Sequence, residues 1–291
     1  SPLADVNAHL KAEAAHHWNQ PRWRQFARTA LKLPITLTAR VVLRDLGHAR
    51  AIASSDVFLA STPQSAERFR RLVRRLHGLQ AAQRVRFVPI PVNFHFDWTE
   101  ACPKQDEVVA TGRWDSLQKR TPLLTSTIGR VLRARMNTRF RIFGTPTTEL
   151  EKWHKELPAE ARNRVTLEGL VSNAQIARAY RRARVMLVSA AYEGCHNSSA
   201  EAVCSGATVV ACTSPFLSAL EWHASKNSGR LARKADAEEL SNALCDELST
   251  WDSGARDPEI ISRKWTRELH PDRVAEQILN IFDQTPPSRE I

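Results

Sequence analysis

Two short apolar runs with a helix-like segment between them constrain the fold of this 291-residue chain most strongly. Residues 184–189 and 207–211 are largely apolar, as is typical of buried strands. Residues 197–205 have a helical pattern, and Gly206 supplies a C-terminal stop. A strand, a Gly-containing turn, a helix and a second strand form a βαβ unit, so the two strands are predicted to be parallel. The turn before the helix then lies at the carboxyl end of a strand, where open α/β sheets bind ligands.

Two acidic residues bracket this predicted helix. Glu193 lies in the turn before it, and Glu201 lies within it. Residues 194–198 form the expected helix N-terminus, where free N–H groups and the helix dipole suit an anion such as a diphosphate. A carboxylate beside an anion is unfavourable unless it has another use, such as accepting hydrogen bonds from sugar or ribose hydroxyls. On spacing alone, two solvated surface charges explain the pair equally well.

The order of residues around these acids resembles a known motif. Glu193-Gly, followed by Ser-Ala-Glu201-Ala and then by Ser-Gly-Ala-Thr-Val-Val, resembles the Glu-x7-Glu motif of group 1 glycosyltransferases, also called glycosyltransferase family 4. These are retaining enzymes with the GT-B fold. The chain departs from the usual pattern at His196, where the family often has Gly, and at Thr208, where it often has Pro.

An earlier segment shares the resemblance. Residues 107–112 predict a strand that ends at Gly112, and Arg113 and Lys119 follow before a predicted helix at 122–135. Two cations on a loop at the carboxyl end of a strand complement the charge of a diphosphate. In the family, the first βα turn of the C-terminal domain has this arrangement, and a Gly-Arg pair and a nearby Lys hold the diphosphate of the donor there.

For a complete enzyme, the resemblance implies transfer of a sugar from a nucleoside diphosphate to a hydroxyl of a sugar, lipid or other acceptor, with retention at the anomeric carbon. It implies that Arg113 and Lys119 stabilise the leaving diphosphate, where charge develops. Glu193 is implied to orient the sugar, and Glu201 to hold the ribose. Backbone groups are implied at Gly112, Gly194, His196 and Asn197 for the phosphates, and at Gly169, Leu170 and Val171 for the base. No metal or other cofactor is implied, and the chain has no Asp-x-Asp triplet.

Strands and helices alternate from residue 107 to residue 248, which predicts a parallel sheet covered on both faces. Asn173 is expected to cap a helix at 174–182, and Asp236 one at 237–248. Other strands are expected at 140–144, 164–169 and 229–232, and other helices at 35–46, 148–156 and 271–283. The expected fold class is α/β, of GT-B type, with a Rossmann-like C-terminal domain and a partial N-terminal domain.

Four regions are expected along the chain. Residues 1–93 are a remnant of the N-terminal, acceptor-side domain, 94–104 a linker, 105–265 the nucleotide-sugar-binding domain, and 266–291 a C-terminal helix and tail. A doubly wound domain needs roughly 100–150 residues, so most of the acceptor-side domain is expected to be absent. A truncated, non-catalytic nucleotide-binding or interaction protein is therefore an alternative. An NAD(P)-dependent enzyme is a third, against which the lack of a Gly-x-Gly-x-x-Gly fingerprint counts.

The chain is strongly basic, with a formal net charge of +11, which favours anionic partners. Nucleic acid is not expected, because no binding motif is present and aromatic residues do not interleave with the basic runs. A helix expected to start after residue 61 carries an apolar stripe and five arginines, Arg68, Arg70, Arg71, Arg74 and Arg75. This basic face is either solvated or in peripheral contact with an anionic membrane.

The five cysteines include no Cys-x2-Cys pair, which argues against a zinc site and fits a reducing, cytoplasmic setting. Cys195 lies at the predicted helix N-terminus, where a thiol pKa can be lowered, but it is interpreted as a pocket-lining residue and not as a nucleophile. The adjacent His16 and His17 point in different directions on a helix, so no shared metal is expected.

Overall fold

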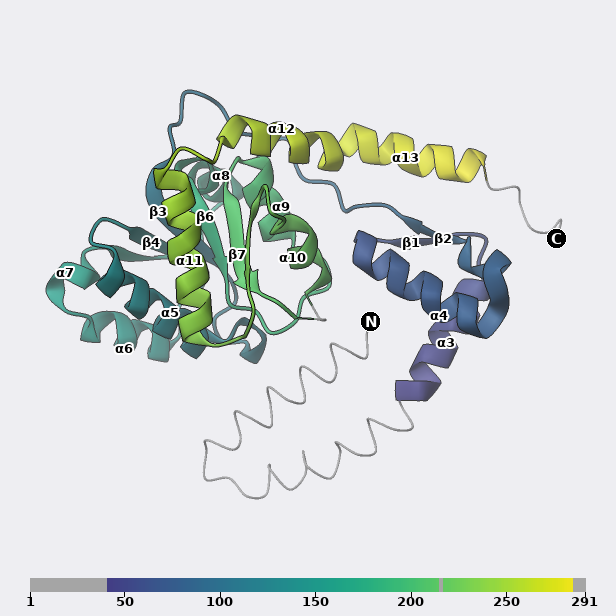
Figure 1. The fold of residues 1–291 in the computed structure, drawn as a ribbon, viewed down its shortest axis with the longest axis horizontal. Coiled ribbons are helices and arrows are strands. Elements are labelled where there is room, and N and C mark those ends of the chain that lie inside the picture. Colours follow the sequence, from purple (N-terminus) through teal and green to yellow (C-terminus); the bar gives the residue numbers. More distant parts are fainter. Residues whose placement is uncertain (1–40, 215–216, 285–291) are drawn as a thin grey trace, which may run out of the picture.

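A computed structural model describes residues 41–214 and 217–284, and its centre is a six-stranded parallel sheet (Figure 1). The strand order is β5-β4-β3-β6-β7-β8. The strands are β3 (Gln105–Thr111), β4 (Arg139–Phe143), β5 (Val165–Gly169), β6 (Ala183–Val188), β7 (Thr208–Cys212) and β8 (Gly229–Ala232). The chain moves outward from β3 to β5, returns to β6 beside β3, and moves outward again to β8. The direction therefore reverses between β3 and β6, where such sheets bind ligands.

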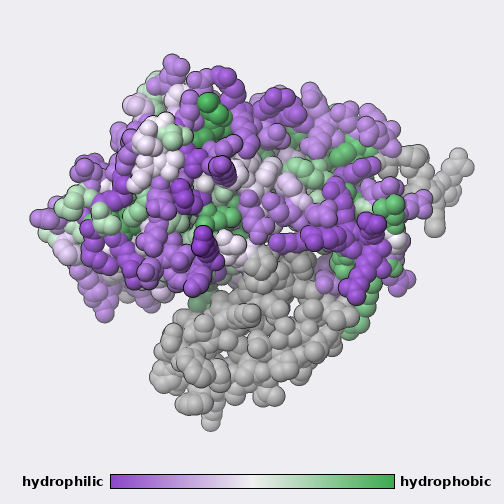
Figure 2. All heavy atoms as spheres, viewed as in Figure 1, coloured by the Kyte–Doolittle hydropathy of each residue, from purple (hydrophilic) through white to green (hydrophobic). Residues whose placement is uncertain are grey.

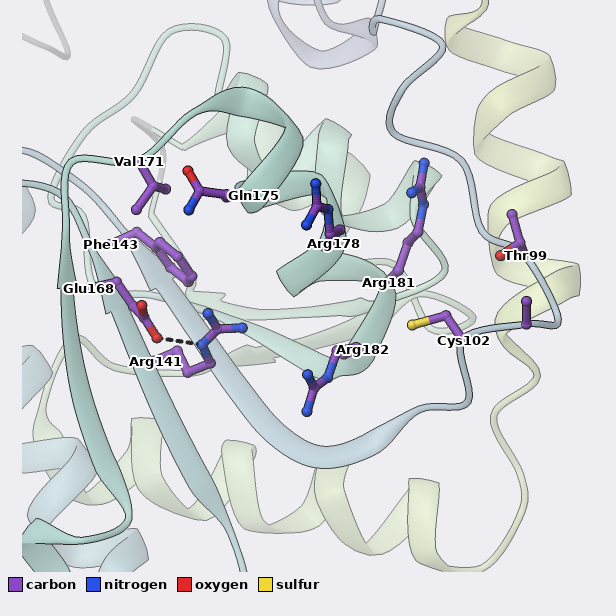
Figure 3. Close-up of a pocket in the computed structure, with 11 residues that line it drawn as sticks. Thr99, Cys102, Arg141, Phe143, Glu168, Val171, Gln175, Arg178, Arg181 and Arg182 are labelled. Atoms are coloured by element: carbon purple, nitrogen blue, oxygen red, sulfur yellow. Dashed lines mark hydrogen bonds and ion pairs between the residues drawn. The ribbon is translucent and has the colours of Figure 1, made fainter.

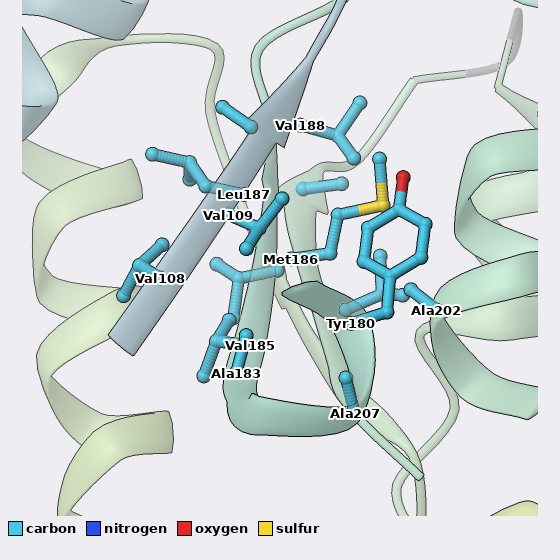
Figure 4. Close-up of a cluster of buried hydrophobic side chains, with 14 of the residues drawn as sticks. Val108, Val109, Tyr180, Ala183, Val185, Met186, Leu187, Val188, Ala202 and Ala207 are labelled. Carbon is cyan, nitrogen blue, oxygen red and sulfur yellow. The ribbon is translucent and has the colours of Figure 1, made fainter. Parts of the chain in front are cut away.

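The central strands are apolar along their length because helices cover both of their faces. Val108 of β3 pairs with Val185 of β6, and Met186 of β6 pairs with Val209 of β7. All four of these side chains are buried. Figure 4 shows Met186 beside the ring of Tyr180, which lies on the helix before β6 and packs onto the sheet. The predicted βαβ unit is confirmed, with β6 and β7 parallel.

Nine helices belong to this part of the described chain: α5 (Thr121–Ala134), α6 (Thr148–Glu156), α7 (Ala159–Arg162), α8 (Asn173–Arg182), α9 (Asn197–Cys204), α10 (Ser218–His223), α11 (Ala237–Asp252), α12 (Pro258–Leu269) and α13 (Pro271–Asp283). Helix α11 packs beside α5, while α9 packs against α8 and α12. The predicted bounds of α6 and α13 are confirmed. The expected helix at 237–248 begins as predicted after Asp236 but continues to Asp252, because the buried Trp251 extends its apolar stripe.

One prediction about a helix is wrong, and one helix was not predicted. The cap of α8 is Ser172 and not Asn173, because the side chains of Ser172 and Gln175 form a reciprocal capping box. Helix α12 was not predicted, and the expected domain boundary at residue 265 falls inside it. Its start has a clear signal, since Asp257 accepts hydrogen bonds from the first turn and Pro258 occupies the first helical position.

The N-terminal part contains α3 (Val41–Ser54), β1 (Phe58–Ala60), α4 (Pro63–Ala82) and β2 (Val85–Phe87). The two strands form a small parallel sheet, and buried apolar residues such as Ile52 and Val73 form a separate core. The first part of the helix expected at 35–46 lies outside the described residues, and α3 extends past its expected end to Ser54. His16 and His17 also lie outside the described residues.

Hydrogen bonds from three segments join the N-terminal part to the larger domain. The backbone N–H of Val92 donates to the carbonyl of Leu269 (2.9 Å), and Thr62 Oγ1 donates to Ser218 Oγ (3.2 Å). Helix α13 runs back toward β1 and β2 (Figure 1), where Gln277 donates to the carbonyl of Phe87 (2.8 Å). The N-terminal strands are therefore attached directly to the larger domain and do not hang from the linker alone.

The predicted basic face of α4 is partly engaged by the protein itself. Arg68 forms an ion pair with Glu221, Arg71 with Glu67, and Arg70 donates to the carbonyl of Val85. Figure 2 shows hydrophilic side chains over much of the visible surface. Among the described residues, no helix is both long and apolar enough for a membrane span.

Candidate functional site

The turns after β3 and β6 lie side by side at the carboxyl edge of the sheet. The backbone N–H of Ala191 donates to the carbonyl of Gln118 (2.7 Å), and Gln118 Nε2 donates to the carbonyl of Tyr192 (2.8 Å). Ser189 Oγ donates to the carbonyl of Lys119 (2.5 Å). These bonds fix the predicted cationic turn against the turn that carries the first acid of the motif.

Lys119 and Glu193 form an ion pair between these turns. Lys119 Nζ lies 2.6 Å from Glu193 Oε1, and the two side chains are 16% and 14% exposed. Gly112 leaves room for the lysine, because a Cβ there would lie 3.3 Å from both Cγ and Cδ of Lys119. An ammonium group has three N–H donors, so the bond to Glu193 leaves two for a ligand.

Glu201 is the second acid of the motif, and its situation differs from that of Glu193. Its carboxylate is half-buried and makes no hydrogen bond or ion pair with any residue in the described ranges. Burial raises its pKa to about 7. It also lies close enough to the buried Tyr180 to help raise the pKa of that phenol, after the larger effect of burial. A half-buried carboxylate without a partner is an available acceptor for ligand hydroxyls.

The N-terminus of α9 lies between the two acids. His196 is the N-cap, and its buried Nδ1 accepts a hydrogen bond from the backbone N–H of Ser199 (3.1 Å). Burial, then Lys119 and His223, lowers the pKa of His196 well below its usual range. The ring is therefore neutral with its proton on Nε2. The sequence predicted only a backbone role for this residue, and its electrostatic interaction with Lys119 could not be predicted.

The backbone beside this cap is open. Gly194 and Asn197 are exposed, and a Cβ added at Gly194 would meet no atom within 4 Å, but the backbone N–H of Asn197 donates to the carbonyl of Cys195 (3.1 Å). Cys195 between them is half-buried, and burial raises the pKa of its thiol despite a hydrogen bond with Ser61. A raised pKa argues against a nucleophilic thiol, in agreement with the interpretation of Cys195 as a pocket-lining residue.

A small cavity of about 170 Å³ lies on the other side of Gly112. Its lining includes Gly112, Gly169, Leu170 and Val171, four of the residues expected near the donor. Gly144 also lines it but was not singled out from the sequence, although it is the last residue of a predicted strand. Its φ is +109°, and a Cβ there would lie 1.9 Å from the carbonyl oxygen of Gly112.

The predicted cations are not all brought together. Arg113 is exposed, and its side chain makes no hydrogen bond or ion pair within the described part of the chain. Arg120, which was not predicted, follows Lys119 directly with a φ of +48°. Its guanidinium is half-buried without a partner among the described residues, and burial lowers its pKa. The sequence did contain a signal for Arg120, because it is a third basic residue in the same turn as Arg113 and Lys119.

The site can now be compared with known proteins. The family model of group 1 glycosyl transferases matches residues 105–250. The structure is similar to sucrose-phosphate synthase from Thermosynechococcus elongatus (20% identity, TM-score 0.62, 83% of this chain and 61% of that chain). It is also similar to the pneumococcal O-GlcNAc transferase GtfA in complex with UDP and GlcNAc (15%, 0.61, 79% and 45%), and to Anabaena HepE in complex with UDP and glucose (15%, 0.57, 79% and 64%).

The chain spans less than two thirds of the length of each of these three structures. No curated protein sequence matches it. The structural neighbours are GT-B glycosyltransferases, and the expected α/β architecture is confirmed. The family match covers half of the chain and contains both facing turns, with Lys119 and Glu193, as well as Glu201. The chain therefore belongs to the group 1 glycosyl transferases and has the GT-B fold.

Proposed function

We propose that this chain binds a nucleoside-diphosphate sugar and, as part of a complete two-domain enzyme, transfers the sugar to a hydroxyl acceptor with retention at the anomeric carbon. The observation that carries the proposal is the contrast between the two acids. Glu193 is paired with Lys119, whereas the half-buried Glu201 has no partner among the described residues. An unpaired carboxylate in such a place is costly unless a ligand uses it.

The arrangement supports one orientation of the donor. The diphosphate lies against the free N–H groups of Lys119 and the exposed backbone at Gly194, at the positive end of α9. The ribose hydroxyls donate to Glu201. The base lies near residues 169–171 in the small cavity, where backbone groups are exposed to it. GtfA and HepE are both described as complexes with UDP, which supports a nucleoside diphosphate as the ligand class.

In the proposed reaction, the bond between the anomeric carbon and the diphosphate oxygen breaks while the acceptor hydroxyl oxygen bonds to the same carbon from the same face. The proton of the hydroxyl passes to the leaving diphosphate. Negative charge develops on the diphosphate, and Lys119 and the α9 N-terminus stabilise it. Arg113 adds a third positive group when its exposed side chain turns toward the phosphates. Glu193, held in place by Lys119, accepts hydrogen bonds from the sugar. The proposal uses no metal, because these groups of the chain face the diphosphate.

Calorimetry with UDP, GDP, ADP and NAD tests the proposal. We expect at least one nucleoside diphosphate to bind, and Glu201→Gln to weaken it by about 1–3 kcal/mol, the cost of a lost hydrogen bond to a charged group. Glu276→Gln, an exposed change on α13, is the matched control and leaves the affinity unchanged. Binding of NAD alone, or no effect of Glu201→Gln in a folded variant, would refute the proposed donor site.

A second candidate function is nucleotide binding without transfer. The observation that favours it is the small size of the N-terminal sheet, which has two strands in the described residues. Catalysis in a cleft requires both reactants to be held together, and this positioning supplies roughly 7–11 kcal/mol. We therefore expect the 291-residue chain to bind nucleoside diphosphate and transfer little sugar. Rapid transfer by this chain alone would show that its N-terminal part is a working acceptor domain.

We also propose a cytoplasmic setting with peripheral contact to an anionic membrane through α4. Arg74 and Arg75 are exposed and make no ion pair with the described residues. Leu76 beside them is 40% exposed, and Leu79, which lies beyond the kink at Gly78, is 59% exposed. Exposed basic and apolar side chains on one helix are typical of interfacial helices.

A further inference from the structure

We propose a second anion-binding site, for a small ligand with phosphate or sulfate groups, in a hollow beside the donor site. The hollow has a volume of about 400 Å³ and lies where β4, β5 and α8 meet the linker (Figure 3). Ligand pockets for small molecules have volumes of roughly 300–1,000 Å³. Four arginines line the hollow, namely Arg141, Arg178, Arg181 and Arg182, together with a single carboxylate, that of Glu168.

Two of these arginines are neutralised by the protein. Arg141 Nε lies 2.6 Å from Glu168 Oε1, and the second carboxylate near Arg141, that of Glu107, lies 3.7 Å away. Arg181 lies 2.7 Å from Asp97 Oδ1 and also donates to main-chain carbonyls of the linker. Their roles are to hold β4 to β5 and α8 to the linker, which makes the walls of the hollow rigid.

Neither of the other two arginines forms an ion pair with a carboxylate in the described part of the chain, and only Arg182 is attracted at longer range, by Glu107. Arg178 makes no hydrogen bond or ion pair there, and Arg182 donates only to the neutral Gln105 Oε1 (2.7 Å). They lie four residues apart on α8, and Figure 3 shows both beside the hollow, with their guanidinium groups pointing apart. Like charges at this spacing repel each other and destabilise a helix.

The helix dipole explains only part of this charge. Arg181 and Arg182 lie in the last turn of α8, where the negative end of the dipole favours cations. Arg178 lies before that turn, and the effect decays within the last turn. An oxyanion shared between Arg178 and Arg182 removes their repulsion, because each guanidinium can offer two parallel N–H donors to a tetrahedral oxyanion.

The hollow is next to the donor site but separate from it. Phe143 and Val171 line both the hollow and the smaller cavity, whereas Lys119, Glu193 and Glu201 do not line the hollow. The inference therefore does not rest on the proposed function. Because Arg178 and Arg182 are exposed, binding is expected to weaken as the ionic strength rises.

Calorimetry of the full chain with pyrophosphate, and separately with sulfate, tests this site at low ionic strength. Pyrophosphate is expected to occupy the hollow and the donor site. In the double variant Arg178→Ala/Arg182→Ala, the affinity of the hollow for pyrophosphate is expected to fall at least ten-fold, while nucleoside diphosphate binds unchanged. Lys119→Ala is expected to weaken only the binding of pyrophosphate at the donor site. Arg273→Ala, at an exposed position on α13, is the matched control and changes neither.

Cys102 gives a local readout because its free thiol lines the hollow. Pyrophosphate should slow alkylation of Cys102 in the wild type and not in the double variant, while the similarly half-buried Cys245 reacts at an unchanged rate. Undiminished pyrophosphate binding and Cys102 protection in the folded double variant would overturn the inference. Pyrophosphate protection of Cys102 without any nucleotide binding would instead support this site and refute the donor site.

Discussion

The ammonium group of Lys104 donates a hydrogen bond to the carbonyl oxygen of Tyr180 over 2.8 Å. A second bond of 2.8 Å joins the same nitrogen to the carbonyl oxygen of Ser205. Tyr180 lies in the last turn of α8 and Ser205 is the C-cap of α9, so one lysine of the linker serves two helix ends whose dipoles favour a cation. Burial nevertheless lowers the pKa of Lys104 well below its usual range.

Replacement of this lysine should destabilise the domain. In Lys104→Met, two buried carbonyls lose their donor, which costs about 1–3 kcal/mol. The folded-state pKa lies below the unfolded one, so the unfolded state binds more protons between the two values. The stability of the wild type relative to the variant should therefore increase as the pH rises through that window. Urea unfolding of both proteins over a pH series measures this, and a difference that is constant with pH would contradict it.

The opposite sign is expected at Glu201. Its folded-state pKa is raised to about 7, so between the unfolded value and pH 7 the folded state binds more protons. Stability from this group is present at low pH and is lost as the pH rises to about 7. Relative to the wild type, Glu201→Gln should therefore gain roughly 1–3 kcal/mol of stability between pH 5 and pH 8. Equal stability differences at both pH values, by urea unfolding, would show that the carboxylate is not desolvated.

Gly144 should tolerate no side chain. In Gly144→Ala, the added Cβ would lie 1.9 Å from the carbonyl of Gly112, and the φ of +109° is itself unfavourable. We expect a loss of stability above about 3 kcal/mol, or a displaced turn with weaker nucleotide binding. Gly254→Ala is the control, because Gly254 has a φ of +72° but open space around it, and should cost only about 1–2 kcal/mol. Thermal unfolding that ranks the two variants equally would contradict the steric argument.

Lys119 and Arg113 should act on phosphate and not on the nucleoside. Lys119→Ala should weaken a nucleoside diphosphate by ten-fold or more, because it removes N–H donors and leaves Glu193 without its partner. Arg113→Ala should weaken it less, because this side chain is exposed and must be ordered on binding. Titration with the matched nucleoside provides the comparison. Equal losses for nucleoside and diphosphate would show that these cations do not contact phosphate.

The α4 surface should bind anionic vesicles in a salt-dependent way. Each basic residue near such a membrane contributes roughly 1 kcal/mol. Arg74→Glu/Arg75→Glu should abolish co-sedimentation with vesicles that contain anionic lipid. Lys155→Glu/Arg162→Glu changes the charge equally at exposed positions near α7 and should have little effect. Binding that ignores lipid charge and ionic strength would leave a solvated face as the explanation of the arginines.

The local elements of the fold could be predicted, because each has its own signal. The β6–α9–β7 unit follows from two apolar runs and Gly206, whose φ of +73° fits its expected role as a helix stop. The start of α11 follows from Asp236, whose side chain accepts from Glu239 as a cap should. Where two good caps are adjacent, as at Ser172 and Asn173, the reciprocal bond with Gln175 decides, and pattern alone does not.

The contacts of the site could be predicted only in part. The resemblance placed Lys119 and Glu193 at one ligand, but their ion pair spans 74 residues and depends on β3 lying beside β6. Strand order is a property of the whole sheet and has no local signal. The arginine hollow was missed for the same reason, since Arg141 and Arg178 belong to different elements and meet only in the folded chain.

The bond between Val92 and Leu269 has a mechanical consequence. It ties the segment just before the linker to the end of α12, where the chain enters α13. The chain therefore passes between the two parts twice, and the two passing segments are bonded to each other. This bonded point acts as a hinge, and rotation about it is the relative motion of the two parts that costs least free energy. Such a rotation would move Thr62 away from Ser218 and Ser61 away from Cys195, which would uncover the α9 N-terminus and leave the sheet undisturbed.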